Sequence, residues 1–145
     1  MEIVSVAVSK KKGTRKKIVD EALLIQDHGI EGDAHAGPWH RQVSFLAAES
    51  IEKARSQGLE VTFGDFAENI ATAGIDWQKI PVGTQLRLGD RVRVEVTQIG
   101  KECHTRCAIY YMAGDCIMPK EGIFARVLEG GKIRPGDIIA IQGET

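Results

Sequence analysis

The sequence predicts a mainly β fold, a β-barrel with a few short helices, formed by residues 1–145 as a single domain. Short runs of apolar and β-branched residues recur along the chain, and 16 glycines provide turn positions between them. A convincing helical pattern occurs in one segment only. A length of 145 residues suits one domain with its own hydrophobic core, and no linker or low-complexity stretch divides it.

The predicted strands are spread over the whole sequence. They occupy residues 2–9, 17–26, 41–47, 91–99 and 137–143. The clearest is RVRVEVTQI at residues 91–99, because Val92, Val94 and Val96 alternate with polar residues and therefore share one face of a strand. The first, EIVSVAVS, is favoured by its density of β-branched residues.

One helix is predicted within residues 47–60, AAESIEKARSQGLE. Ala47, Ile51 and Ala54 follow helical spacing and would form one apolar face. Gly58 stands where a helix C-terminal cap is expected, since glycine tolerates the left-handed backbone found there.

Residues 121–131, EGIFARVLEGG, could form either a strand or a helix, and the alternation of apolar residues from Ile123 to Val127 favours a strand. The sequence also contains a weak internal repeat. Residues 82–96 and 130–141 share a glycine, an apolar-Arg-x-Gly-Asp stretch and an apolar run. Each Gly-Asp pair provides turn chemistry between two strands.

Composition excludes several classes of function. A formal net charge of −1 argues against nucleic acid as the main partner, because proteins that bind phosphate backbones are usually basic. No apolar run approaches the ~18 residues that cross a bilayer, and the N-terminal apolar stretch precedes the lysines, the reverse of a signal peptide. Three cysteines are few for a secreted disulfide scaffold, so a cytoplasmic location is expected. The oligomeric state is left open.

Two polar segments are candidates for binding. Six of the eight residues 10–17 are basic, which suits either an anion-binding loop or a solvated hairpin turn. Residues 28–44 contain three histidines and several glycines. Within them, Asp33 and His35 could pair to hold a metal or to act as acid and base, whereas a surface loop would explain the same residues.

A third polar segment is GDFAENIATAG at residues 64–74. It places Glu68 and Asn69 in a turn bounded by glycines, and the asparagine amide can both donate to and accept from a ligand. The alternative is that Asp65 and Asn69 cap the turn locally.

All three cysteines lie within residues 100–116, GKECHTRCAIYYMAGDC. The spacing is not Cys-x-x-Cys, which argues against a thioredoxin motif or a zinc ribbon, although a zinc site formed with His104 is an alternative. Cys103 has Lys101 and His104 nearby, and positive neighbours favour the thiolate form. Such a thiolate could attack, accept a sulfur atom or bind a soft metal. The other two cysteines are expected in the core.

Over nearly its whole length the chain resembles a MOSC domain, the module named after the C-terminal part of molybdenum-cofactor sulfurase, in a small stand-alone bacterial form. The segments that carry the resemblance are SKKKGTRK, GIEGDAHAG, RQVSFLAAESI, GDFAENI, GTQLRLGD, TQIGKECH and GIFARVLEGGKIRPGD. The resemblance implies a barrel-based β fold and one functional cysteine, Cys103, that carries sulfur as a persulfide or ligates molybdenum. Two features depart from the family: Glu102 replaces a frequent proline, and no desulfurase domain with pyridoxal phosphate is present.

The resemblance also implies a site for the molybdenum cofactor, molybdopterin, with Cys103 as its catalytic residue and metal ligand. The implied cofactor-binding residues are Lys12, Lys16, Asp33, His35, Arg41, Asn69, Lys101 and Arg126. The implied function is cofactor binding, sulfur carriage, or both. The implied partners are a cysteine desulfurase and a molybdoenzyme or cofactor-biosynthesis proteins. A molybdenum-dependent reductase of N-hydroxylated compounds and a non-catalytic zinc-binding adaptor are the alternatives.

Overall fold

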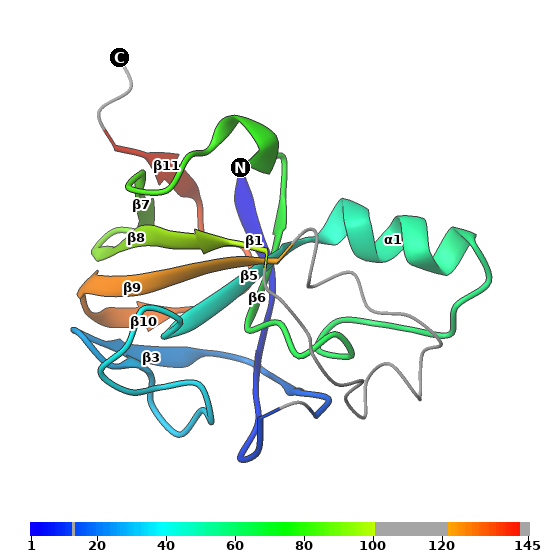
Figure 1. The fold of residues 1–145 in the computed structure, drawn as a ribbon, viewed down its shortest axis with the longest axis horizontal. Coiled ribbons are helices and arrows are strands. Elements are labelled where there is room, and N and C mark those ends of the chain that lie inside the picture. The colour runs from blue at the N-terminus through cyan, green and yellow to red at the C-terminus, as the bar shows by residue number, and fades with distance from the viewer. Residues whose placement is uncertain (13, 101–121, 143–145) are drawn as a thin grey trace.

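The computed structural model describes residues 1–12, 14–100 and 122–142, and within them the fold is mainly β (Figure 1). The strands are β1 (Glu2–Val8), β2 (Lys17–Val19), β3 (Ala22–Ile25), β4 (Gly29–Ile30), β5 (Val43–Ala47), β6 (Ile70–Ala73), β7 (Gln85–Leu88), β8 (Val92–Ile99), β9 (Ile123–Glu129), β10 (Gly131–Ile133) and β11 (Ile139–Ile141). The helical elements of these residues are α1 (Ala48–Ser56) and the 3-10 helix η1 (Trp77–Lys79). The mainly β class expected from sequence is confirmed.

The described strands form two sheets. The larger has the order β11-β7-β8-β9-β5-β6-β1-β2, and the smaller has the order β10-β3-β4. All their pairings are antiparallel except that of β5 with β6. This exception follows from the connection, because parallel neighbours need a long crossover and α1 lies between these two strands in the chain.

Within the described residues, the start of β1 makes a few contacts with the segment before β11, the strand at the other edge of the larger sheet. Glu2 of β1 forms an isolated bridge with Ile138, and the Ile3 N–H donates to the Asp137 carbonyl at 2.8 Å. These contacts lie just before β11, but the pairings found there do not make a continuous ladder. Closure of the expected barrel therefore stays a prediction.

The helix expected within residues 47–60 is confirmed as α1, and Gly58 follows its end with φ 97°. The Gly58 N–H donates to the Arg55 carbonyl, and the Leu59 N–H donates to the Ala54 carbonyl. These two bonds satisfy carbonyls that a helix terminus leaves open, in the manner of a Schellman motif.

The expected single strand at residues 17–26 is wrong in one respect, because the chain divides it between β2 and β3. Residues 20 and 21, Asp and Glu, interrupt the run, and the two parts join different sheets. The predicted strands at residues 2–9, 41–47, 91–99 and 121–131 correspond to β1, β5, β8 and β9, and that at 137–143 corresponds to the shorter β11.

Two apolar clusters hold these elements together. The larger contains buried residues of both sheets, such as Phe45 and Val94 from one and Leu24 from the other. The smaller lies under α1, where Ile51 and Ala54 cluster with residues of β5, β6 and β9. No helix among the described residues is long and apolar enough to cross a membrane.

Candidate functional site

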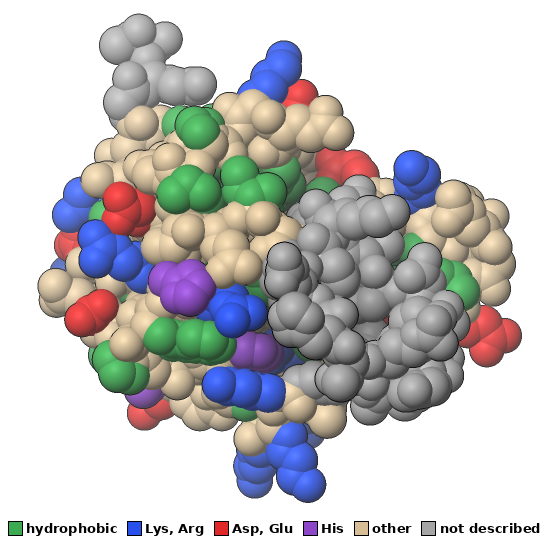
Figure 2. All heavy atoms as spheres, viewed as in Figure 1, with side chains coloured by type: hydrophobic (Ala, Val, Ile, Leu, Met, Phe, Trp, Pro, Cys, Tyr) green, Lys and Arg blue, Asp and Glu red, His purple; other side chains and the backbone are tan. Residues whose placement is uncertain are grey.

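Two segments that are separate in sequence meet at one end of the fold. Residues 9–16 join β1 to β2, and residues 31–42 join β4 to β5. The Ala34 N–H donates to the Ser9 carbonyl at 2.8 Å, which ties the two segments together. Figure 2 shows histidine, lysine and arginine side chains gathered on the face formed by these segments.

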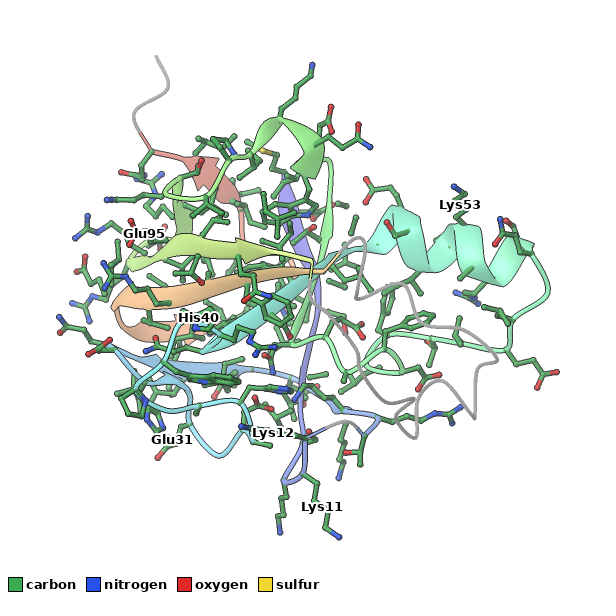
Figure 3. All side chains as sticks on the ribbon, in the orientation of Figure 1. Lys11, Lys12, Glu31, His40, Lys53 and Glu95 are labelled. Carbon is green, nitrogen blue, oxygen red and sulfur yellow. The ribbon has the colours of Figure 1, made fainter. Side chains whose placement is uncertain are left out.

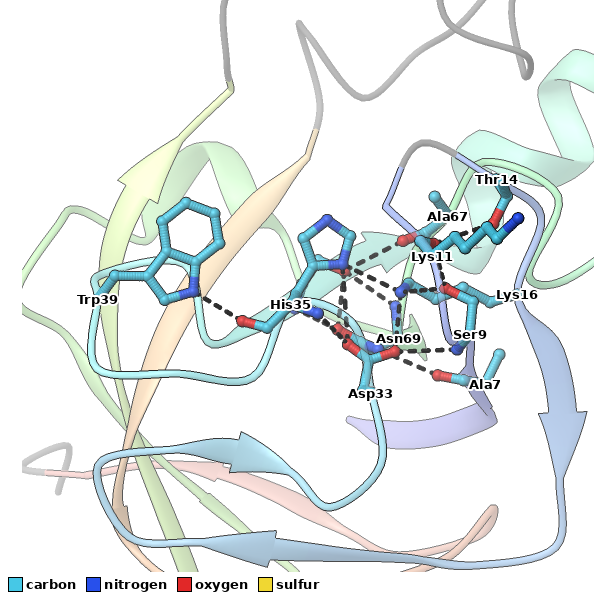
Figure 4. A network of polar contacts seen from close by, with 11 residues as sticks. Ala7, Ser9, Lys11, Thr14, Lys16, Asp33, His35, Trp39, Ala67 and Asn69 are labelled. Carbon is cyan, nitrogen blue, oxygen red and sulfur yellow. Dashed lines mark hydrogen bonds and ion pairs between the residues drawn. The ribbon is translucent and has the colours of Figure 1, made fainter.

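Lys16 and Asp33 form a buried ion pair at this junction (Figure 4). The Lys16 Nζ lies 2.8 Å from Asp33 Oδ1, and neither side chain is exposed to solvent. The Ser9 N–H also donates to Oδ1, and the His35 N–H donates to Oδ2, each at 3.0 Å. Burial raises the pKa of Asp33, but the hydrogen bonds with His35 and Lys16 and the charge of Lys16 outweigh it and hold this pKa well below its usual value.

The ammonium group of Lys16 also orients His35. Its Nζ lies 3.0 Å from His35 Nδ1 and donates to Ser9 Oγ at 3.0 Å. An ammonium group only donates, so a neutral His35 would accept at Nδ1 and carry its proton on Nε2. The Lys16 Nζ, Asp33 carboxylate and His35 ring therefore form one connected polar network.

Trp39 lies beside this network, half-buried, and several contacts converge on it. Its indole N–H donates to the His35 carbonyl at 2.7 Å, and its ring is stacked with the His35 ring, 4° from parallel at 6.5 Å between centroids. The Lys12 Nζ is 4.4 Å and the Arg41 Cζ 4.9 Å from the Trp39 ring centroid. Sequence reasoning missed Trp39, although an aromatic residue between a glycine-rich stretch and basic residues was a usable signal.

The same loop is attached to the end of β8. The His40 Nε2 lies 2.7 Å from Gln98 Oε1, and Gln98 Nε2 donates to the Gly100 carbonyl at 2.7 Å (Figure 3 labels His40). The Gly100 N–H donates to the Gly122 carbonyl, so the chain leaves and re-enters the described fold at this point. The predicted site residues Cys103 and Lys101 lie outside the described residues, as do the other two cysteines and His104 of the zinc alternative. The described residues contain no metal-binding group of three His, Cys, Asp or Glu.

Asn69, another predicted site residue, is buried at the junction of three strands. Its Oδ1 accepts from the Ser44 N–H at 2.9 Å and from Ser44 Oγ at 3.1 Å, and its Nδ2 donates to the Ala7 carbonyl at 3.1 Å. The amide thus bridges backbone groups of β1 and β5 directly before β6. In this position it links strands with both ends of its side chain.

Glu68 is also buried, and its carboxylate faces backbone donors. It accepts from the Gly64 N–H at 2.7 Å and from the Phe66 N–H at 3.2 Å. Burial raises its pKa to about 7, against the opposing effect of these hydrogen bonds. Gly64 in turn contacts Lys16, whose N–H donates to the Gly64 carbonyl at 2.8 Å, so this turn supports the Lys16 backbone.

The structure brings together five of the predicted cofactor-binding residues, namely Lys12, Lys16, Asp33, His35 and Arg41. Arg126 has a different environment, because it is exposed on β9 and its Nε donates to Glu95 Oε1 at 2.8 Å. The buried Nε of Arg41 has no hydrogen-bond partner within the residues that the structure describes.

Comparison with known proteins gives one family match. The family model of the MOSC domain matches residues 32–140. No curated protein is a significant match to the chain.

Several solved structures share the fold. They include the YUAD protein from Bacillus subtilis, with a TM-score of 0.78 and 16% identity over 95% of this chain and 93% of that chain. YiiM from Geobacillus stearothermophilus has a TM-score of 0.73 and 22% identity over 97% of this chain and 74% of that one. YiiM from Escherichia coli has a TM-score of 0.69 and 22% identity over 100% and 71% of the two chains. At these identities the similarity establishes the fold alone.

Proposed function

Because this chain belongs to the MOSC domain family, we propose that it binds the molybdenum cofactor, carries sulfur, or does both. In this proposal Cys103 accepts persulfide sulfur and delivers it to the cofactor or to another acceptor. The supporting observation is the cluster of Lys12, Lys16, His35 and Arg41. The His40–Gln98 contact attaches it to the end of β8, and β8 ends four residues before Cys103 in the sequence. A reducing, cytoplasmic setting is part of the proposal, because there the thiol would be kept reduced.

The described residues fit the anionic end of such a cofactor. Neither Lys12 nor Arg41 has a carboxylate oxygen within 4.0 Å among them, and the buried Arg41 Nε lacks an acceptor. A phosphate oxygen is a strong acceptor for both ammonium and guanidinium donors. When bound, the cofactor would supply a molybdenum centre, for which a thiolate is a suitable soft ligand.

The sulfur-carrying step needs a persulfide donor. The Cys103 thiolate attacks the terminal sulfur of a persulfide on the partner desulfurase, and a new S–S bond forms on Cys103. The S–S bond of the partner breaks, and the partner cysteine leaves as a thiolate with the electron pair. No external oxidant is required. In this proposal the pyridoxal phosphate chemistry takes place on the partner desulfurase.

Intact mass spectrometry tests the sulfur step. Incubation of the purified protein with a cysteine desulfurase and cysteine should add the mass of one sulfur atom, and a reductant should remove it. Cys103→Ser should abolish the addition, whereas Cys107→Ser and Cys116→Ser serve as matched controls that keep it. An unmodified wild-type chain would count against sulfur carriage.

Cofactor binding is tested on protein made in a host that synthesises molybdopterin. Stoichiometric molybdenum and pterin fluorescence are expected in the wild type, and less of both is expected in Arg41→Gln. Absence of both, together with no sulfur loading, would refute the proposed function. Turnover of an N-hydroxylated compound with an electron donor would favour the reductase alternative, and stoichiometric zinc would favour the adaptor alternative.

A further inference from the structure

We propose that Trp39 positions Lys12 and Arg41 as a paired cation site for a doubly charged oxyanion such as a phosphate monoester. For the identity of the natural ligand we rely on the proposed function. The site itself follows from the contacts of one side chain. Lys12 comes from the segment between β1 and β2, and Arg41 comes from the segment that leads into β5, so the indole ring brings together charges that lie far apart in the sequence.

The orientation of the Trp39 ring is fixed from two sides. The indole N–H donates to the His35 carbonyl, and the ring lies nearly parallel to the His35 imidazole. His35 is held in turn, because its N–H donates to Asp33, whose carboxylate is buried. A half-buried aromatic ring would otherwise be free to change rotamer, so this support determines where its faces point.

The two cations contact the same aromatic ring. Lys12 Nζ and Arg41 Cζ are 4.4 and 4.9 Å from the same ring centroid. They are therefore within roughly 10 Å of each other, about one Debye length at 0.1 M ionic strength, and salt screens their repulsion only in part. The negative face of an indole ring attracts each cation and offsets some of this repulsion.

An anion would complete this arrangement. Of the two acidic residues in segment 31–42, Glu31 is exposed, and the carboxylate of Asp33 is already bound to Lys16, Ser9 and His35. Arg41 has a buried Nε without an acceptor among the described residues, and leaving such a donor unpaired is unfavourable. An oxyanion carries enough acceptors to bind the guanidinium and the ammonium at once.

A fluorescence titration with inorganic phosphate tests the site. Trp39 and Trp77 are the two tryptophans of the chain, so in a Trp77→Phe background the emission reports on Trp39 alone. Phosphate should change this emission saturably. Lys12→Gln and Arg41→Gln should each weaken phosphate binding about tenfold, as expected for loss of one charge-assisted contact. Lys53→Gln, on α1 and away from Lys12 in Figure 3, should leave it unchanged.

The positioning role of Trp39 is tested by calorimetry with phosphate in variants that lack this reporter. Trp39→Leu should weaken binding about tenfold, because it removes both the aromatic face and the N–H. Trp39→Phe keeps a face and should recover part of the affinity. Circular dichroism must show the same melting behaviour for the variants that are compared. Arg41→Lys provides a further variant, which retains the positive charge but loses the planar set of guanidinium donors.

Several outcomes would overturn the inference. Binding by Trp39→Leu as tight as in the wild type would show that the ring positions nothing. An equal loss in Lys53→Gln and Lys12→Gln would show that net charge alone governs binding. Sulfur loading of Cys103 is measured in the same preparations. Loading without phosphate binding refutes the cation site alone, and phosphate binding without loading refutes sulfur carriage alone.

Discussion

Lys16 and Asp33 form an ion pair in which Nζ and Oδ1 are 2.8 Å apart and both side chains are completely shielded from solvent. Removing two charges from water is unfavourable, so such a pair persists only where further hydrogen bonds support it. Ser9 and His35 supply that support from both sides of the junction. The pair therefore fixes residues 9–16 against residues 31–42, the two segments that carry the candidate site.

Asp33→Asn should destabilise the protein by about 3–5 kcal/mol, because it leaves the buried Lys16 ammonium without its counter-charge. The new amide NH2 would also face the His35 N–H, which now donates to Oδ2. Urea denaturation followed by circular dichroism measures the change. Glu52→Gln is the control, since Glu52 pairs with Arg55 on the exposed side of α1 and should cost less than about 0.5 kcal/mol. Equal losses in both variants would contradict the structural role of the buried pair.

Glu68 should make the protein less stable as the pH rises from the ordinary glutamate value of 4.5 to about 7. In this interval the folded state binds more protons than the unfolded state, so raising the pH favours unfolding, by up to about 3 kcal/mol in all. Asp33 has the opposite sign, because its lowered pKa gives stability that is lost as the pH falls below its usual value. Taken by themselves, these two effects give a stability maximum at about pH 4, between the ordinary values of 3.8 for Asp33 and 4.5 for Glu68.

Glu68→Gln isolates the first of these effects. The glutamine stays neutral throughout, so the free energy of unfolding should change much less between pH 5 and pH 8, as approximate test conditions, than in the wild type. Glu60→Gln, at an exposed position, should keep the wild-type slope. An unchanged slope in Glu68→Gln would assign the pH dependence to another group.

Gly64→Ala should be strongly destabilising because a Cβ atom there would lie 2.3 Å from the Lys16 carbonyl oxygen. Gly64 also has φ 88°, which strains any other residue. Gly58→Ala is a matched control with φ 97° and no atom within 4 Å of the added carbon, so it should cost only about 1 kcal/mol for the backbone strain. The excess cost in Gly64→Ala measures the close approach of the turn to Lys16. Similar melting temperatures for the two variants would contradict that approach.

Local patterns predicted the elements whose burial follows a simple period. The alternation of Val92, Val94 and Val96 identified β8, and the spacing of Ile51 and Ala54 identified α1. The same reasoning joined β2 and β3 into one strand, because periodicity does not tell where a chain passes from one sheet to another. In the smaller sheet β3 pairs with β4, which follows it closely, and with β10, more than 100 residues later. The pairing with β10 could not be predicted from local sequence.

The candidate site, too, could be predicted only in part, because residues distant in the sequence form it. Asp33 and His35 stood out because they are close in sequence, and the resemblance to a family linked them to Lys12, Lys16 and Arg41. The position of Trp39 beside a glycine-rich stretch was a local signal, but its contact with Lys12, 27 residues earlier, could be found only in the folded chain. The predicted ligand role of Arg126 stays a prediction, and its guanidinium is bonded to Glu95 in the structure.

Asn69 is the predicted ligand whose structural role can be separated from binding most directly. Asn69→Ala would leave the Ser44 N–H and the Ala7 carbonyl buried without their side-chain partner, and a loss of about 2–4 kcal/mol is expected. Gln78→Ala, at an exposed position of η1, should change the free energy of unfolding by less than about 0.5 kcal/mol. If Asn69 only links strands, the folded fraction of Asn69→Ala will bind phosphate as the wild type does. Weakened binding with unchanged stability would instead make Asn69 part of the phosphate site, because a purely structural amide cannot produce that combination.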